Sequence, residues 1–182
     1  MNKISFIYPD DLLVTKPFRV SAVVTSGNIF SLVTLNWTGR SMRLAPTACL
    51  TLPVDEERVT HPQFEHWLEL FTKGMEIPHV VIRRGPDTGP HKAAPLAVKV
   101  ETILEFIPSV GTSRVHACAV TGWVNRANWL LPLPQDELTA PERKVQQRCI
   151  ETAAFVVARV LEHRASLFPD GPPPTWIELA AA

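Results

Sequence analysis

The sequence lacks an excess of charge of either sign. Its 182 residues include 18 lysines and arginines and 18 aspartates and glutamates, so the formal net charge is zero. Proteins that bind nucleic acid usually carry a basic excess, which displaces counterions from the phosphates. The balance therefore argues against a nucleic-acid partner, without excluding a local basic patch.

Long apolar runs are also missing. No stretch reaches the roughly 18 to 20 apolar residues that a membrane-spanning helix needs, and residues 1–6 lack the apolar core of a signal peptide. The three cysteines, Cys49, Cys118 and Cys149, are odd in number and widely spaced, which favours reduced thiols over a disulfide framework. These features predict a cytoplasmic protein without a membrane partner.

Motifs of nucleophilic or metal-dependent catalysis are absent as well. The sequence has no G-x-S-x-G elbow, no C-x-x-C pair and no G-x-x-x-x-G-K-[ST] phosphate loop. The acidic clusters at residues 10–11 and 55–57 are typical of solvated turns. His116 and Cys118 would share one face of an expected strand, which favours a buried thiol beside a histidine over a metal site. The sequence therefore predicts no catalytic residue and no metal ligand, and it identifies no cofactor.

Two capping boxes mark the starts of helices. Thr60-His61-Pro62-Gln63 predicts a helix over about residues 62–73, and Thr139-Ala140-Pro141-Glu142 predicts a longer one over about residues 140–167. Both segments carry apolar residues at helical spacing, which indicates that they pack on a sheet, and the longer one could also pack on a partner subunit.

Most of the remaining chain has the pattern of short strands separated by proline. The sequence contains 17 prolines, and the expected strands cover residues 4–8, 19–25, 29–37, 48–54, 79–82, 97–107 and 114–124. The last two are expected to form the longest strand pair. The sum is an α+β fold: a mostly antiparallel sheet or partly open barrel of about seven to eight strands with two helices, the longer near the C-terminus. Residues 1–168 would form this single domain, followed by a proline-rich tail over 169–182.

One loop, over residues 83–92, concentrates basic side chains and glycines. Its candidates for binding an anion or ligand are Arg83, Arg84, His91 and Lys92, because guanidinium groups bind phosphate and glycines let backbone amides approach it. The alternative interpretation of the segment is a plain exposed loop.

The first functional hypothesis is a non-catalytic interaction or assembly subunit of a larger complex. Its partner chain, or a second copy of itself, would bind the C-terminal helix and the tail, where aromatic and apolar anchors dominate binding energy. The candidate contacts are Phe155, Leu161, Trp176, Ile177 and Leu179.

The second hypothesis is a small-ligand-binding β-barrel. Val23-Val24-Thr25, a Gly27-Asn28 turn and Leu35-Asn36-Trp37, followed by a helix and a long strand pair, give an order of elements similar to that of flavin-reductase-like split barrels. The resemblance implies flavin mononucleotide bound at a homodimer interface, with oxidoreductase activity. A third hypothesis is a nucleic-acid-binding module that uses Arg40, Arg43, Arg83 and Arg84, whose binding would weaken steeply with salt.

Overall fold

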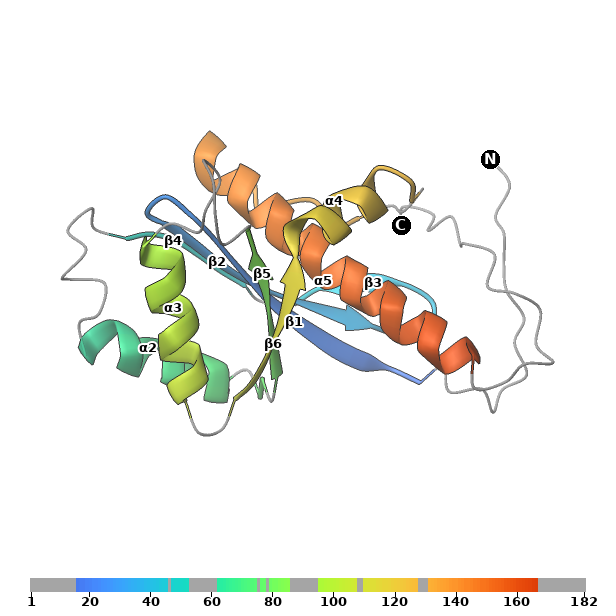
Figure 1. Ribbon diagram of the computed structural model, residues 1–182, viewed down its shortest axis with the longest axis horizontal. Helices are drawn as coiled ribbons and strands as arrows, with labels where there is room; N and C mark the ends of the chain where they lie inside the picture. Colours follow the sequence, from blue (N-terminus) through green and yellow to red (C-terminus); the bar gives the residue numbers. More distant parts are fainter. Residues whose placement is uncertain are drawn as a thin grey trace.

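An open, six-stranded sheet with helices on both faces makes up the described part of the chain (Figure 1). The computed structural model describes residues 16–45, 47–52, 62–74, 76–77, 79–85, 95–107, 110–127 and 131–166. In chain order the elements are β1 Phe18–Ser26, β2 Ile29–Trp37, β3 Met42–Leu44, β4 Ala48–Thr51, α2 Pro62–Gly74, β5 His79–Arg84, α3 Pro95–Phe106, β6 Gly111–His116, α4 Ala117–Val124 and α5 Ala140–Ser166. The expected strand at residues 4–8 and the tail at 169–182 lie outside the described residues.

A hairpin of β1 and β2 forms the centre of the sheet. The two strands pair antiparallel over all nine residues of each. The tight turn between them needs a residue with positive φ, which Gly27 supplies at +59°. Asn28 then fixes the turn to the residue after β4, because its Nδ2 donates to the Leu52 carbonyl at 2.9 Å. The hairpin predicted from the sequence is confirmed.

Two parallel strands extend the sheet beyond β1. The strand order is β3-β2-β1-β5-β6, and β4 pairs with β2 at the end that β3 leaves open. Because β5 runs parallel to β1 and β6 parallel to β5, these three strands end at one edge of the sheet, which we call the carboxyl edge. The α+β class is confirmed, but the sheet is mixed and unclosed, so it is no split barrel.

Helices α3 and α4 replace most of the strand pair expected over residues 97–107 and 114–124, and β6 keeps a short part of it. The reason for α3 is its apolar spacing of i, i+3, i+4 and i+7, which buries one side of a helix. The buried residues at this spacing are Val100, Ile103 and Leu104 within α3, and Ile107 directly after it. The β-branched residues of this segment favour a strand, but strand propensity depends strongly on context. The helical spacing of the apolar residues therefore decides the structure.

The two helices predicted from their capping boxes are both present, as α2 and α5. At the start of α5, Glu142 reaches back to Thr139, and its Oε2 accepts from the Thr139 backbone N at 3.0 Å and from the Thr139 hydroxyl at 2.7 Å. Thr60, the cap residue expected for α2, lies outside the described residues.

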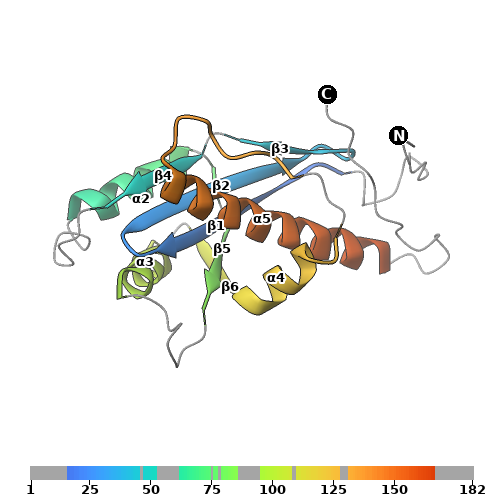
Figure 2. The same cartoon turned by 90° about the horizontal axis from the view of Figure 1, so that it is seen from above.

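An apolar core lies on each face of the sheet. Helix α5 runs along one face with α4 beside it, and α2 and α3 cover the other face (Figure 2). Cys149, fully buried in α5, joins helix to sheet, because its thiol donates to the carbonyl oxygens of Ala22 at 3.1 Å and Ser31 at 3.4 Å. None of the helices within the described ranges is long and apolar enough to cross a membrane.

Candidate functional site

Open sheets with parallel strands bind ligands beyond the carboxyl ends of those strands. The carboxyl edge is therefore a candidate binding site. Strand β5 ends there with Arg83 and Arg84. Side chains of a strand alternate between its faces. Arg83 therefore shares the α5 face with Val81, and Arg84 shares the α2 and α3 face with Ile82. The two arginines, grouped as one anion-binding set by the sequence, lie on opposite sides of the sheet.

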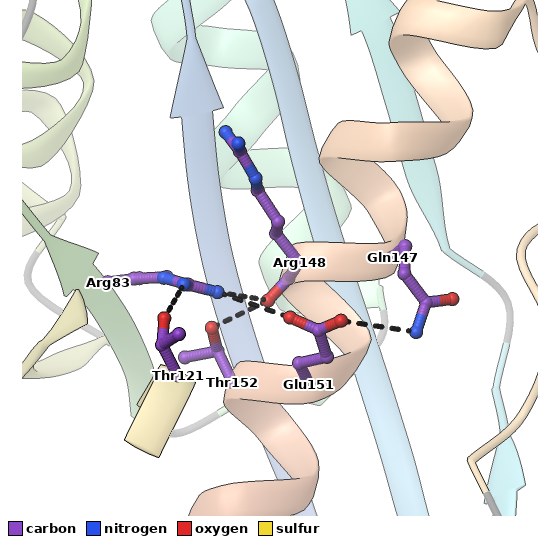
Figure 3. Close-up of polar contacts among 6 residues, drawn as sticks. All are labelled: Arg83, Thr121, Gln147, Arg148, Glu151 and Thr152. Carbon is purple, nitrogen blue, oxygen red and sulfur yellow. Dashed lines mark hydrogen bonds and ion pairs between the residues drawn. The ribbon is translucent and has the colours of Figure 1, made fainter. Parts of the chain in front are cut away.

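Arg83 joins three elements on the α5 face (Figure 3). Its Nη2 donates to Thr121 Oγ1 of α4 at 3.0 Å, and its Nη1 donates to the Arg148 carbonyl of α5 at 3.3 Å. The same Nη1 lies 3.5 Å from Oε2 of Glu151, one turn further along α5. Only 11% of the Arg83 side chain and 20% of the Glu151 side chain are exposed. The end of β5 is thus tied to both helices by a largely buried guanidinium group.

Burial and charge act against each other in this network. Burial lowers the pKa of Arg83 from its usual value, the Glu151 carboxylate raises it, and the neighbouring Arg148 guanidinium lowers it again. Glu151 also accepts a hydrogen bond from Gln147 Nε2 at 3.4 Å. The Glu151 carboxylate is therefore held by two donors, Arg83 and Gln147.

The Arg148 side chain extends away from the Arg83–Glu151 pair (Figure 3). It is half-buried, and its guanidinium makes no hydrogen bond or ion pair with any residue of the described ranges. Its backbone carbonyl, by contrast, accepts from Arg83 and, at 2.7 Å, from the Thr152 hydroxyl. Lys144, one turn earlier on α5, is exposed. Together these side chains give the α5 side of the carboxyl edge a local excess of positive charge.

The charges around Arg84, on the opposite face, are balanced. Arg114 of β6 lies 3.5 Å from Oε2 of Glu101 and also pairs with Glu105, both on α3. Burial raises the pKa of Glu101, whereas the positive charges of Arg84 and Arg114 lower it. Among the described residues of this cluster, the charges of two arginines and two glutamates balance.

The other basic candidates do not join Arg83. Arg40 and Arg43 are exposed in the β2–β3 turn and on β3, at the far edge of the sheet from β6. His91 and Lys92 lie outside the described residues. The arginines of the third sequence-based hypothesis therefore form no single patch.

The expected partner contacts on α5 are engaged within the chain. The Phe155 ring packs edge-on against Trp123 of α4, with ring centroids 5.9 Å apart. Leu161 is buried in the core between α5 and the sheet. Trp176, Ile177 and Leu179 of the tail lie outside the described residues.

His116 and Cys118 do not share a strand face. Strand β6 ends at His116, and Cys118 lies exposed in the first turn of α4, where its backbone N donates to His116 Nδ1 at 3.4 Å. His116 thus acts as a helix cap. Within the described residues, no group of three or more histidine, cysteine or acidic side chains is placed to hold a metal ion.

The sequence did not identify Thr121, Arg148 or Glu151 as members of a site. Thr121 was assigned to a strand, and Glu151 to the polar side of the long helix. A usable signal was present, because Arg148 and Glu151 are three apart on a helix and so lie on one side of it. Their link to Arg83 depends on the parallel pairing of β5 with β1, over which α5 packs, and the sequence did not predict this pairing.

The sequence matches no protein-family model and no curated protein. The fold is similar to that of Thermus thermophilus RuvC, with a TM-score of 0.55 and 9% sequence identity, over 82% of this chain and 97% of that chain. It is also similar to T. thermophilus RuvC in complex with a Holliday junction substrate, with a TM-score of 0.52 and 9% identity, over 86% and 99% of the two chains. At 9% identity, the similarity shows a shared fold alone.

These similarities overturn the functional predictions made from the sequence. The fold is similar to that of RuvC, one structure of which holds a Holliday junction substrate, and this finding contradicts the prediction of a non-catalytic interaction or assembly subunit. The flavin-binding barrel is wrong too, because the sheet is open and mixed. The prediction that a nucleic-acid partner is unlikely is contradicted by the similarity to RuvC in complex with a Holliday junction substrate.

Proposed function

We propose that this protein binds branched DNA of the Holliday junction kind. The observation that carries the proposal is the similarity of fold to RuvC, which covers 97% of one RuvC chain and 99% of a RuvC chain solved with a Holliday junction substrate. The two matches cover 82% and 86% of this chain.

The charges at the carboxyl edge support this proposal. Arg83 is paired with Glu151, whereas Arg148 has no acidic partner within the described residues and Lys144, one turn earlier on α5, is exposed. Arginine and lysine bind the phosphates of DNA without reading its sequence, and this backbone contact supplies much of the affinity of such proteins. A ligand recognised by its branched shape needs contacts of this kind.

Enzymes that cut nucleic acid commonly hold divalent ions with several carboxylates. The described residues of this edge do not fit such an ion. Glu151 is already bound by Arg83 and Gln147, and the positive charges of Arg83 and Arg148 would repel a divalent cation beside it. We therefore derive no metal-dependent step at this edge and make DNA binding the proposed function.

Fluorescence anisotropy with two labelled probes tests the proposal: a four-way junction, and a linear duplex of the same total length. We expect the junction to bind at least about tenfold more tightly, which corresponds to roughly 1.4 kcal/mol. Equal affinity for both probes would reduce the interaction to non-specific attraction, and absence of binding to either would refute the proposal.

A cytoplasmic location is part of the same proposal. All three cysteines, Cys49, Cys118 and Cys149, are free thiols in the structure, which supports a reducing compartment.

A further inference from the structure

We propose that the α5 side of the carboxyl edge holds a DNA phosphate without a divalent metal ion, and that Arg148 is the group that contacts it. The inference rests on the proposed DNA binding and adds to it the residue, the ligand group and the independence from metal. Arg83 is the second, fixed cation of this site.

The first argument is the unequal use of the two guanidinium groups. Arg83 is largely buried and fully engaged with Glu151, Thr121 and the Arg148 carbonyl. Arg148 sits beside it on α5, yet its guanidinium contacts no hydrogen-bond acceptor or carboxylate of the described ranges. A half-buried arginine without an internal partner leaves its planar fork of donors open, and that fork matches the geometry of a phosphate.

The second argument is electrostatic. Arg83 and Arg148 are neighbouring positive charges, and after the larger effect of burial the Arg148 guanidinium contributes to the lowered pKa of Arg83. Partial burial strengthens their mutual repulsion, because the effective dielectric constant is lower than in bulk water. An anion bound by Arg148 would relieve it, whereas a divalent cation would increase it. The site therefore selects a phosphate and needs no metal ion to attract one.

The third argument is rigidity. The Arg148 carbonyl accepts hydrogen bonds from Arg83 and Thr152, so the backbone that carries the Arg148 side chain is fixed from two directions. Thr121 anchors Arg83 in turn to α4. A binding group on a helix held in this way is preorganised, and less conformational freedom is lost when the phosphate binds.

The test measures junction binding at equal ionic strength, with either Mg²⁺ or EDTA present, over a series of NaCl concentrations. We expect the wild-type protein to bind as well in EDTA as in Mg²⁺. Arg148→Gln should weaken binding about tenfold or more. The slope of log Kobs against log[NaCl] should become shallower by about one, as expected for one lost phosphate contact. Arg148→Lys, which keeps the charge but not the fork, should retain the slope and recover part of the affinity.

Arg159→Gln is the matched control. Arg159 lies on the same helix, is 66% exposed and pairs with Glu162, so the substitution makes the same change in net charge away from the edge. Affinity and salt slope should stay near wild type. Circular dichroism checks that each variant is folded. If Arg148→Gln does not fold, the affinity of Arg148→Lys is compared with that of the wild type instead.

The outcomes separate this inference from the proposed function. If the wild-type protein binds the junction but Arg148→Gln loses no more affinity than Arg159→Gln, the inference is refuted and DNA binding stands. The same holds if EDTA abolishes wild-type binding. If the wild-type protein binds no DNA in any condition, both proposals are refuted.

Discussion

Arg83 at the end of β5 and Glu151 in the middle of α5 form an ion pair, with 3.5 Å between Nη1 and Oε2. They are 68 positions apart in the sequence (151 − 83). The pair fixes the long helix over the carboxyl edge. Both side chains are largely buried, so each depends on the other to offset the loss of hydration. The ion pair is thus part of the architecture that places Arg148 beside the edge.

Glu151→Gln should destabilise the protein. The substitution leaves Arg83 largely buried without its carboxylate, and an uncompensated charge of this kind costs about 1–3 kcal/mol. Urea denaturation measures the difference in the free energy of unfolding. Glu162→Gln serves as control, because Glu162 pairs with the exposed Arg159 on the same helix and such a surface pair contributes about 0–1 kcal/mol. Equal effects of the two substitutions would contradict this account.

Glu101→Gln should have the opposite effect at neutral pH. Burial raises the pKa of Glu101, and the charges of Arg84 and Arg114 do not fully offset it. A carboxyl whose folded-state pKa lies above its unfolded value stabilises the fold below the unfolded pKa, near 4.5, and this contribution is lost as the pH rises through the folded pKa. Glutamine resembles the protonated form, so the variant should be at least as stable as the wild type at pH 7.

The pH dependence provides the sharper measurement for Glu101. As the pH rises from about 4.5, the unfolding free energy of the wild type should fall relative to that of Glu101→Gln. Glu105→Gln is the control, because Glu105 also pairs with Arg114 but its side chain is 38% exposed. A Glu101→Gln variant that is clearly less stable than wild type at pH 7 would show that the ion pair with Arg114 outweighs the cost of burial.

Local patterns in the sequence were sufficient to predict several elements. The capping box at Thr139 and the turn at Gly27 each depend on residues within a few positions, and α5 and the β1–β2 hairpin are present where these signals place them. Segment 97–107 shows how such patterns can conflict. Its β-branched residues indicate a strand, whereas its apolar spacing indicates a helix, and the spacing decides because it determines which side chains are buried.

The site was less accessible from the sequence, because it depends on contacts across long distances in the chain. Arg83 was recognised as a basic candidate, but it was grouped with its neighbour Arg84, from which the alternation of the strand separates it. Its actual partners, Thr121 and Glu151, come from two other elements. Net charge carries little information on a binding site for a related reason: it sums over the whole surface, whereas a bound ion responds to the few charges nearest to it.

Thr51→Val should make the acid denaturation of the protein less steep. Hydrogen bonds from the Thr51 hydroxyl, at 2.6 Å, and then from Thr139 lower the pKa of Glu142. A depressed carboxyl pKa stabilises the fold above the unfolded value, near 4.5, and this stability is lost as the pH falls through the folded pKa. Without the Thr51 donor, less stability should be lost below pH 4.5 in a pH titration followed by circular dichroism. Thr102→Val removes an exposed hydroxyl that donates to the Val98 carbonyl. It should leave the loss of stability below pH 4.5 unchanged.

The three cysteines should react with a thiol reagent at very different rates in the folded protein. Cys149 is fully buried, and burial raises its pKa to about 12, while burial and the nearby Glu142 raise the pKa of Cys49 to about 11. The thiolate is the reactive form, so both should be almost inert at pH 8, whereas the exposed Cys118 should react quickly. Labelling with an aromatic disulfide reagent should therefore show one fast thiol in the native state and three in urea, and Cys118→Ser should abolish the fast phase. Fast labelling of two or three thiols without urea would mean that α5 separates from the sheet far more readily than its packing indicates, because Cys149 lies on the side of α5 that packs on the sheet.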